Sequence, residues 1–410
     1  MLLGLGIPVL AIAKIPYNIS IIMTFICIVF VGLCSIWSYN LLKNLYNKQI
    51  GIKIQNYEDL CLNICGKKIT YLLVINLSLY TLGLIVIHQV FIFRLLEGII
   101  NIIGGYNYES MINFEKETYW KDIWFKVFAN FGIGILILFP LCLRKKEEII
   151  NKSSSIGFYS LLYIFLAILV QFPFYFIEYL NNEYKKEDEN THINIYNIKS
   201  GFTNQVKFLQ ALGIFFFFFL GNNDIFPILE KTDKIIIKSK NITKSIIFDG
   251  VIYFMIALFG YLSVPIDIVD IVFERKKIWN ADIVMTIARI LLIPMAISTI
   301  QINHNIWRIK FSKFFYRVDN RIKFNCLFTA ITLFITTLLS SFYQNIVGYI
   351  SLIGSFLVVF PAFLFPPLML IYNNFKDWKY IIYLIIGIIL CVIGVISGIF
   401  AFIDIIRRQI

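Results

Sequence analysis

Charged residues are scarce in this 410-residue sequence. They make up 15% of the chain, against about 25% in an ordinary soluble domain. Apolar residue types reach 59%, and phenylalanine alone occurs 40 times. A soluble core cannot enclose that much apolar surface without leaving large exposed patches. The composition therefore excludes a cytosolic enzyme, a disordered chain and a collagen-like fibre, and it indicates an all-α polytopic membrane protein.

Histidine is also scarce, and the cysteines form no recognisable framework. Three His residues occur, at positions 88, 192 and 304, and the seven Cys show no disulfide pattern. Cys61 and Cys65 have helical spacing, but no second Cys or His pair stands nearby to complete a zinc site. A membrane-embedded enzyme needs a concentrated set of intramembrane His, Asp or Cys, which this sequence lacks. We therefore predict no catalytic residues, no bound metal and no cofactor.

Apolar segments of bilayer-spanning length follow one another along the chain. A shorter apolar piece at 1–15, closed by Pro16 and Asn18, precedes them. Because most connections are short, residues 1–410 are expected to form a single transmembrane domain. The ten full segments lie at 19–42, 69–96, 123–143, 156–177, 206–228, 245–264, 283–303, 324–342, 347–371 and 380–404.

The net charge of +12 is distributed unevenly between the expected sides of the membrane. If the loop 43–68 is cytoplasmic and the sides alternate, the inner segments carry 22 of the 37 Lys and Arg residues but only 8 of the 25 acidic ones. Basic residues gather in the cytoplasmic loops of membrane proteins and fix their orientation. We therefore predict that the positive charge reflects insertion into a lipid bilayer and that the protein does not bind nucleic acid. The oligomeric state stays open.

Two apolar segments are interrupted by residues that weaken helices. Gly4–Pro8 interrupts the first piece, and Gly221–Pro227 interrupts the segment 206–228. Backbone groups freed by such breaks are tolerated in a membrane where they line a polar cavity. Broken helices at corresponding positions of two halves point to the midplane site of a transporter. The spacing fits two inverted five-helix repeats, at about 1–177 and about 206–371, followed by one extra helix at 380–404.

The breaks also predict which ligand chemistry they serve. Freed N–H groups at the N-terminus of a half-helix hold a carboxylate, and freed carbonyls hold an amino group or a small cation. A free amino acid needs both kinds of group. The alternative is that Gly4 and Gly6 only allow close packing between helices.

An ordered series of short motifs resembles the amino acid/auxin permease family, particularly its sodium-coupled neutral amino acid transporters. Each motif is weak alone, but together they run from residue 4 to about residue 371 in the family's order. The matching stretches are Gly4–Ala11, Tyr57–Leu60, Leu138–Leu141, Asp224–Ile228, Ala257–Leu262 and Ile346–Ser355.

The resemblance implies a LeuT-like fold of about eleven helices, the first of them incomplete, and amino acid transport by alternating access. It implies that Gly4, Gly6 and Ile7 face the substrate carboxylate. Phe219, Gly221 and Asn222 would line the unwound part of the sixth helix, with Phe215–Phe219 and Tyr80 as apolar pocket walls. In sodium-coupled members a hydroxyl of the eighth helix binds the cation, which corresponds to Ser298 or Thr299 here.

The sequence departs from the family pattern in two ways. The family has a further apolar stretch before the Gly4–Gly6 motif, so we expect that the printed chain begins inside the first helix. Asn222 and Asn223 stand where the family often has His-Pro, and Ile297 and Pro294 alter its eighth-helix pattern. Coupling to Na⁺ and coupling to protons are therefore both open.

Three ionisable residues lie within or beside the expected spans. Asp224 either binds the coupling proton or is a carboxylate wetted by the inner vestibule. His88 is either a proton acceptor or a core histidine hydrogen-bonded to a carbonyl. Asp249 is expected to open the seventh helix near the inner surface, as a structural N-terminal carboxylate.

The predicted function is thus a secondary active amino acid transporter coupled to protons or sodium. A non-transporting amino-acid sensor on the same fold, or a carrier of another small organic solute, are the alternatives. We expect the protein in the plasma membrane or in the membrane of an acidic or vacuolar organelle.

Overall fold

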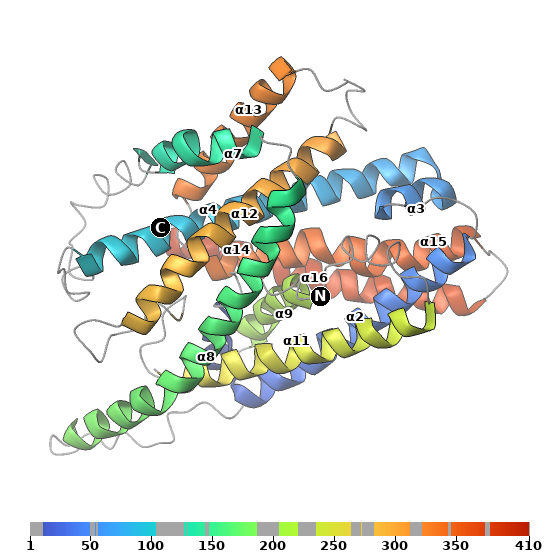
Figure 1. The fold of residues 1–410 in the computed structure, drawn as a ribbon. Coiled ribbons are helices and arrows are strands. Elements are labelled where there is room, and N and C mark those ends of the chain that lie inside the picture. The colour runs from blue at the N-terminus through green and yellow to red at the C-terminus, as the bar shows by residue number, and fades with distance from the viewer. Residues whose placement is uncertain are drawn as a thin grey trace. The chain divides into compact units, whose positions relative to one another are not determined.

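The computed structural model describes eleven stretches of the chain, almost wholly helical, and two single positions between them. The described residues are 11–49, 54, 56–103, 127–128, 130–143, 147–186, 205–219, 235–263, 272, 283–311, 322–342, 346–373 and 378–409. No strand occurs among these residues. The elements are labelled in Figure 1.

The helices have the following bounds: α1 Lys14–Ile19, α2 Ile21–Lys48, α3 Tyr57–Cys65, α4 Lys67–Ile103, η2 Gly134–Leu138, α7 Phe139–Leu143, α8 Glu147–Lys186, α9 Gln205–Phe219, α11 Ile235–Ser263, α12 Ile283–Phe311, α13 Ile322–Phe342, α14 Ile346–Ile353, η8 Gly354–Val358, η9 Phe360–Leu364, α15 Phe365–Asn373 and α16 Trp378–Gln409. The three η elements are π-helical turns inside longer helices.

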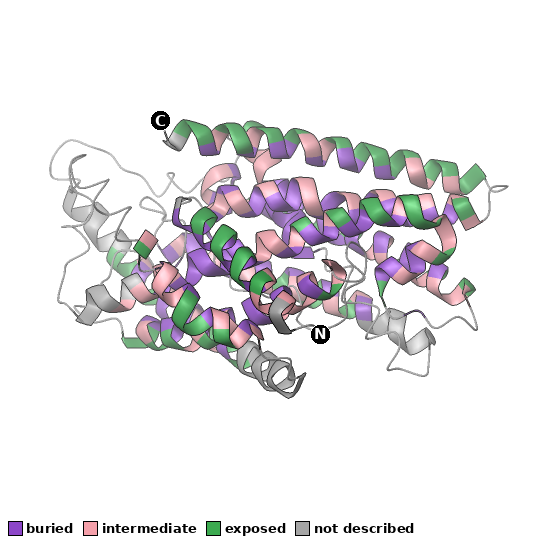
Figure 2. Ribbon diagram, turned by 90° about the horizontal axis from the view of Figure 1, so that it is seen from above, coloured by how far each residue is buried: buried purple, intermediate pink, exposed green. Residues whose placement is uncertain are grey.

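The expected membrane spans are present as helices. Within the described residues, eight helices are long and apolar enough to cross a membrane, and the shorter apolar helices Asn130–Leu143 and Gln205–Phe219 fall in the two other expected segments. Many of their exposed side chains are large and apolar. Figure 2 shows α16, which leads to the C-terminus, with exposed residues along one side and buried residues along the other. The protein is therefore an all-α polytopic membrane protein, as the composition predicted.

The chain divides into two compact units. Unit 1 consists of Met1–Tyr80, Lys199–Leu258 and Val347–Ile410, and unit 2 of Thr81–Ile198 and Phe259–Ile346. Each unit thus takes segments from both of the predicted repeats. The repeats themselves stay a prediction.

The core of unit 1 is built around α9. All nine residues from Ala211 to Phe219 are buried, because α2, α16 and η8 pack against this helix. A helix that is apolar on all sides belongs inside a protein core. The Phe215–Phe219 run therefore serves packing, as expected for a low-complexity stretch inside a span.

Glycines allow the closest helix contacts of unit 1. A Cβ atom on Gly354 of η8 would collide with the carbonyl oxygen of Gly213 in α9, and one on Gly387 of α16 would collide with the carbonyl oxygen of Phe363 in η9. Hydroxyl groups join the same elements: Ser397 donates to the Leu209 carbonyl (2.6 Å) and Ser351 to the Gln210 carbonyl (2.7 Å). Small residues and hydroxyl bonds are the usual means of joining helices in a membrane.

Unit 2 is organised around the contact between α8 and α12. Hydroxyls of α8 bond backbone carbonyls of α12: Ser160 donates to Leu291 (3.2 Å) and Tyr163 to Val284 (3.2 Å). The helix Asn130–Leu143, α13 and the part of α4 from Thr81 onward also belong to this unit. Its polar interior is described further below.

Three expected boundaries are wrong. Helix α1 continues through Pro16 and Asn18 to Ile19, because proline is tolerated in the first turn of a helix. Helix α8 is longer at both ends than the expected span 156–177. Helix α11 begins at Ile235, so Asp249 lies well inside the helix and does not open it.

Candidate substrate and ion sites

Most residues of the predicted substrate site lie outside the described residues. They are Gly4, Gly6, Ile7, Gly221, Asn222 and Asp224. Phe219, Ser298, Thr299 and His88 are described, and their surroundings show what chemistry is within reach of each.

Phe219 lies at the C-terminal end of α9, which adjoins the predicted break in sequence. The last carbonyls of a helix have no partner within the helix and need donors from elsewhere. Ser35 of α2 donates to the Phe219 carbonyl (2.8 Å), and Tyr253 of α11 donates to the Phe218 carbonyl (3.2 Å). The last two described carbonyls of α9 therefore accept hydrogen bonds from two neighbouring helices.

The Phe219 ring is also held in place. It packs edge-on against the Tyr253 ring, with ring centroids 5.1 Å apart. Gly32 of α2 and Gly250 of α11 lie beside it, and a Cβ atom at either position would make only ordinary van der Waals contact with the ring, at 3.7 and 3.5 Å. Tyr80 lies edge-on to Phe217 at 6.3 Å. These contacts bring the predicted aromatic residues together, but as a packed cluster within unit 1.

Ser298 and Thr299 point their hydroxyl hydrogens at carbonyls of their own helix. Ser298 donates to Pro294 (2.8 Å) and Thr299 to Met295 (2.9 Å). The oxygen lone pairs of both hydroxyls stay available to a cation. Pro294 lies inside α12 and has no N–H, so the Ile290 carbonyl loses its usual helix donor.

His88 lies in the middle of α4 with 2% of its surface exposed. Its Nδ1 atom is 2.7 Å from the Leu84 carbonyl. Because a carbonyl only accepts, Nδ1 carries the proton in this contact, and Nε2 of the neutral ring is an acceptor. The buried Nε2 has no hydrogen-bond partner in the described part of the chain. The bond to Leu84 is the one expected of a core histidine, and the role as proton acceptor stays a prediction.

The comparison with protein families decides the identity. Residues 4–407 match the family described as transmembrane amino acid transporter protein. The chain belongs to this transporter family. No curated protein matches this transporter. The sequence resemblance to the amino acid/auxin permeases is thereby confirmed, and the protein is an amino acid transporter in the general sense, with an amino acid as substrate and the lipid bilayer as its surroundings.

Sequence reasoning missed several polar residues of the transporter. Ser35 and Tyr253 are single polar positions in apolar spans, and nothing in the sequence connected them to the end of α9. A clearer signal was present in α13, where hydroxyl residues recur through an apolar span. Those that are buried are Thr329, Thr332, Thr336, Thr337, Ser340 and Ser341. Polar residues inside a membrane are costly and face a protein interior, so this stripe marks the polar interior of unit 2.

No group of three or more His, Cys, Asp or Glu residues arranged to hold a metal occurs in the part of the transporter that the structure describes. Cys61 and Cys65 lie on α3, and their thiols hydrogen-bond each other.

Proposed function

We propose that this transporter moves amino acids across a membrane by alternating access, driven by a gradient of Na⁺ or protons. The proposed substrate site lies between the breaks at Gly4–Pro8 and Gly221–Pro227. The observation that carries the proposal is the buried C-terminal end of α9, where Ser35 and Tyr253 supply the donors that the last carbonyls need. A helix that ends inside a membrane requires such support, and a substrate site at a broken helix requires such an end.

The family indicates an amino acid as the substrate, and the two helix breaks supply backbone groups that can bind its carboxylate and ammonium groups. The free N–H groups of a half-helix favour the substrate carboxylate, and free carbonyls favour its ammonium group. We further propose the plasma membrane or an acidic organelle as the location.

The test is uptake of radiolabelled amino acids by proteoliposomes that contain the purified protein. A panel of amino acids is supplied with an inward Na⁺ gradient and with an inward proton gradient in turn. Accumulation above the level of protein-free liposomes is expected with one of the two gradients. Binding without accumulation or exchange would contradict transport and favour an amino-acid sensor.

The Gly6→Val variant tests the position of the site. A branched side chain beside the substrate carboxylate overpacks the site, which costs about 1–3 kcal/mol and lowers uptake roughly tenfold or more. Gly132→Ala is the matched control, because a Cβ atom there meets nothing within 4 Å. Unchanged uptake by Gly6→Val would show that the substrate binds elsewhere.

A further inference from the structure

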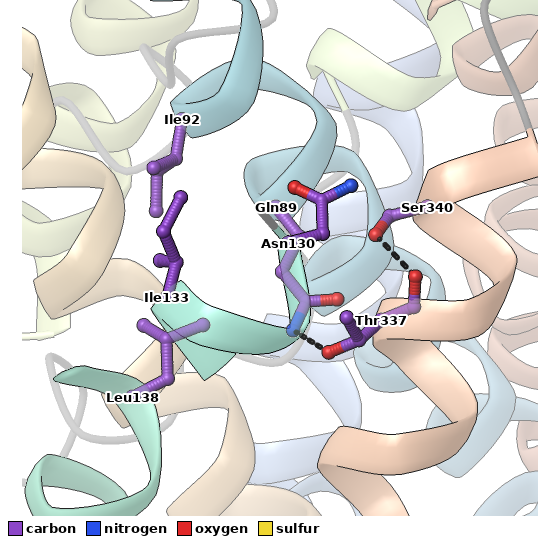
Figure 3. A pocket seen from close by; sticks show the side chains of 7 residues that line it. All are labelled: Gln89, Ile92, Asn130, Ile133, Leu138, Thr337 and Ser340. Atoms are coloured by element: carbon purple, nitrogen blue, oxygen red, sulfur yellow. Dashed lines mark hydrogen bonds between the residues drawn. The ribbon is translucent and has the colours of Figure 1, made fainter. Parts of the chain in front are cut away.

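Unit 2 contains a small cavity of about 10 Å³, room for roughly one water-sized atom, within the membrane-spanning part of the chain. The cavity lies between α4, the helix Asn130–Leu143 and α13. Figure 3 shows polar side chains on one side and aliphatic side chains on the other. The lining residues are Gln89, Asn130, Thr337 and Ser340 on the polar side and Ile92, Ile133 and Leu138 on the aliphatic side.

The polar side chains are deeply buried. The exposed fractions are 5% for Gln89, 7% for Asn130, 2% for Thr337 and 5% for Ser340. Burying an amide or hydroxyl without a partner costs free energy, and four such groups at one place in a membrane need a reason. Hydrogen bonds within the cluster compensate most of this cost, but they leave some oxygen atoms without a donor.

The hydrogen bonds within the cluster leave several oxygen lone pairs without a donor. Gln89 Nε2 donates to Thr337 Oγ1 (3.3 Å), and Asn130 Nδ2 donates to Ser341 Oγ (3.1 Å). The hydroxyls of Ser340 and Ser341 both donate to the Thr337 carbonyl, at 2.9 and 2.8 Å. Thr337 Oγ1 and Ser341 Oγ each accept one amide N–H and keep one further lone pair, and Ser340 Oγ accepts no hydrogen bond among the described residues. Gln89 Oε1 is buried and has no partner among the residues described here.

A cavity edged by open acceptors attracts a group that supplies positive charge. Hard cations bind to oxygen atoms of carbonyls, amides and hydroxyls. The lining contains no carboxylate, so the site suits one positive charge better than two. We propose that this cavity binds a sodium ion, held by the amide oxygen of Gln89 and the hydroxyl oxygens of Thr337 and Ser340.

The backbone beside the cavity is also unusual. The segment Gly134–Leu138 is a π-helical turn, and such turns are frequent at functional sites. Gly134 lets Thr337 come close, since a Cβ atom at position 134 would lie 3.2 Å from Thr337 Oγ1. This site is separate from the hydroxyls of Ser298 and Thr299 on α12. A role of this ion in driving transport rests on the proposed function. Binding of the ion does not depend on it.

The first experiment measures binding without transport. The thermal stability of the purified full-length protein in detergent is followed as NaCl replaces choline chloride at constant ionic strength, with KCl as a second series. The expected result is a saturable rise of the unfolding temperature with NaCl that KCl does not reproduce. Equal stabilisation by all three salts would overturn the proposal and would indicate that the cavity holds water.

Matched variants assign the effect to the cavity. Thr337→Val removes a ligand oxygen at constant shape and should raise the half-saturating Na⁺ concentration about tenfold or more, whereas Thr337→Ser keeps the oxygen and should stay close to the wild type. Gln89→Leu should act like Thr337→Val, and Ser340→Ala replaces it if Gln89→Leu does not fold. A sodium effect that survives in Thr337→Val but is lost in Ser298→Ala or Thr299→Ala would place the ion on α12 and overturn the proposal.

Uptake assays separate this proposal from the proposed function. Sodium binding without uptake of any amino acid would contradict transport and leave the ion site standing. Uptake that is unchanged in Thr337→Val, together with no sodium-dependent stabilisation of the wild type, would contradict the ion site and leave transport standing.

Discussion

At the scale of single residues, Ser35 and Tyr253 are the two side chains that hold the last described carbonyls of α9 beside the proposed site. Each donates to a carbonyl at the end of α9, and each loss leaves a buried acceptor without its partner. We expect Ser35→Ala and Tyr253→Phe each to lower the free energy of unfolding by about 1–2 kcal/mol. Because the end of α9 adjoins the predicted break, both variants should also lower amino acid uptake. Thermal unfolding in detergent and proteoliposome uptake measure the two effects.

The matched control for Ser35→Ala is Ser263→Ala. Ser263 is also buried, but its hydroxyl donates to the Phe259 carbonyl of its own helix (2.7 Å). Such back-bonding within a helix contributes little to stability, so this variant should unfold and transport like the wild type. Equal loss in both serine variants would mean that the bond to α9 has no special role.

At the scale of elements, the short helix α3 is tied to the membrane helices by Tyr57. Its hydroxyl donates to the Pro361 carbonyl (2.8 Å). Burial, reinforced by the neighbouring thiols of Cys61 and Cys65 and the carboxylate of Glu58, raises the pKa of Tyr57 well above its ordinary value of 10.0. The folded protein therefore holds the phenol proton more tightly than the unfolded chain does.

This shift predicts a specific pH dependence. A group whose pKa is raised by folding contributes stability below its unfolded pKa and loses it as the pH rises beyond that value. The wild type should thus lose stability above about pH 10 more steeply than Tyr57→Phe, which also lacks about 1 kcal/mol of hydrogen bonding at neutral pH. Thermal unfolding between neutral pH and about pH 11 tests this. Parallel pH curves for the two proteins would contradict it.

The contact between α16 and η9 depends on a glycine. A side chain at Gly387 would collide with the Phe363 carbonyl, so Gly387→Ala should lower the free energy of unfolding by about 1–3 kcal/mol. Gly132→Ala, at an open helical position, should be neutral or slightly stabilising. If Gly387→Ala unfolds at the wild-type temperature in detergent, the close approach of these two elements is absent in solution.

At the scale of the whole molecule, the distribution of charge predicts the orientation. The segment 181–199 should lie on the side opposite to the loops 43–68 and 230–244. A glycosylation sequon introduced within 181–199 should be modified during translation with microsomes, whereas the sequons at Asn151 and Asn241 should stay unmodified. Glycosylation of Asn241, without glycosylation within 181–199, would show that the protein has the opposite orientation in the membrane.

The fold was predictable further than the site was. Spans follow from apolar runs, because lipid forces every backbone group into a helix, and the long run 380–404 is a clear case. Helix ends were less predictable, since Pro16 and Asp249 have several acceptable helical positions. The cluster around Gln89 and Thr337 was not predictable, because its members lie far apart in sequence and only tertiary packing brings them together. The Gly4 and Gly221 breaks stay predictions.

The burial of α9 has a consequence for biosynthesis. Its partners include residues near the end of the chain: Gln210 donates to the Phe400 carbonyl (3.0 Å), and Ser397 donates to the Leu209 carbonyl. At about 5–20 residues per second, a ribosome needs roughly 10–40 s to pass from α9 to these residues. During that interval the part of α9 that carries Leu209 and Gln210 lacks its partner α16. Unit 1 is therefore completed only when the last helix arrives.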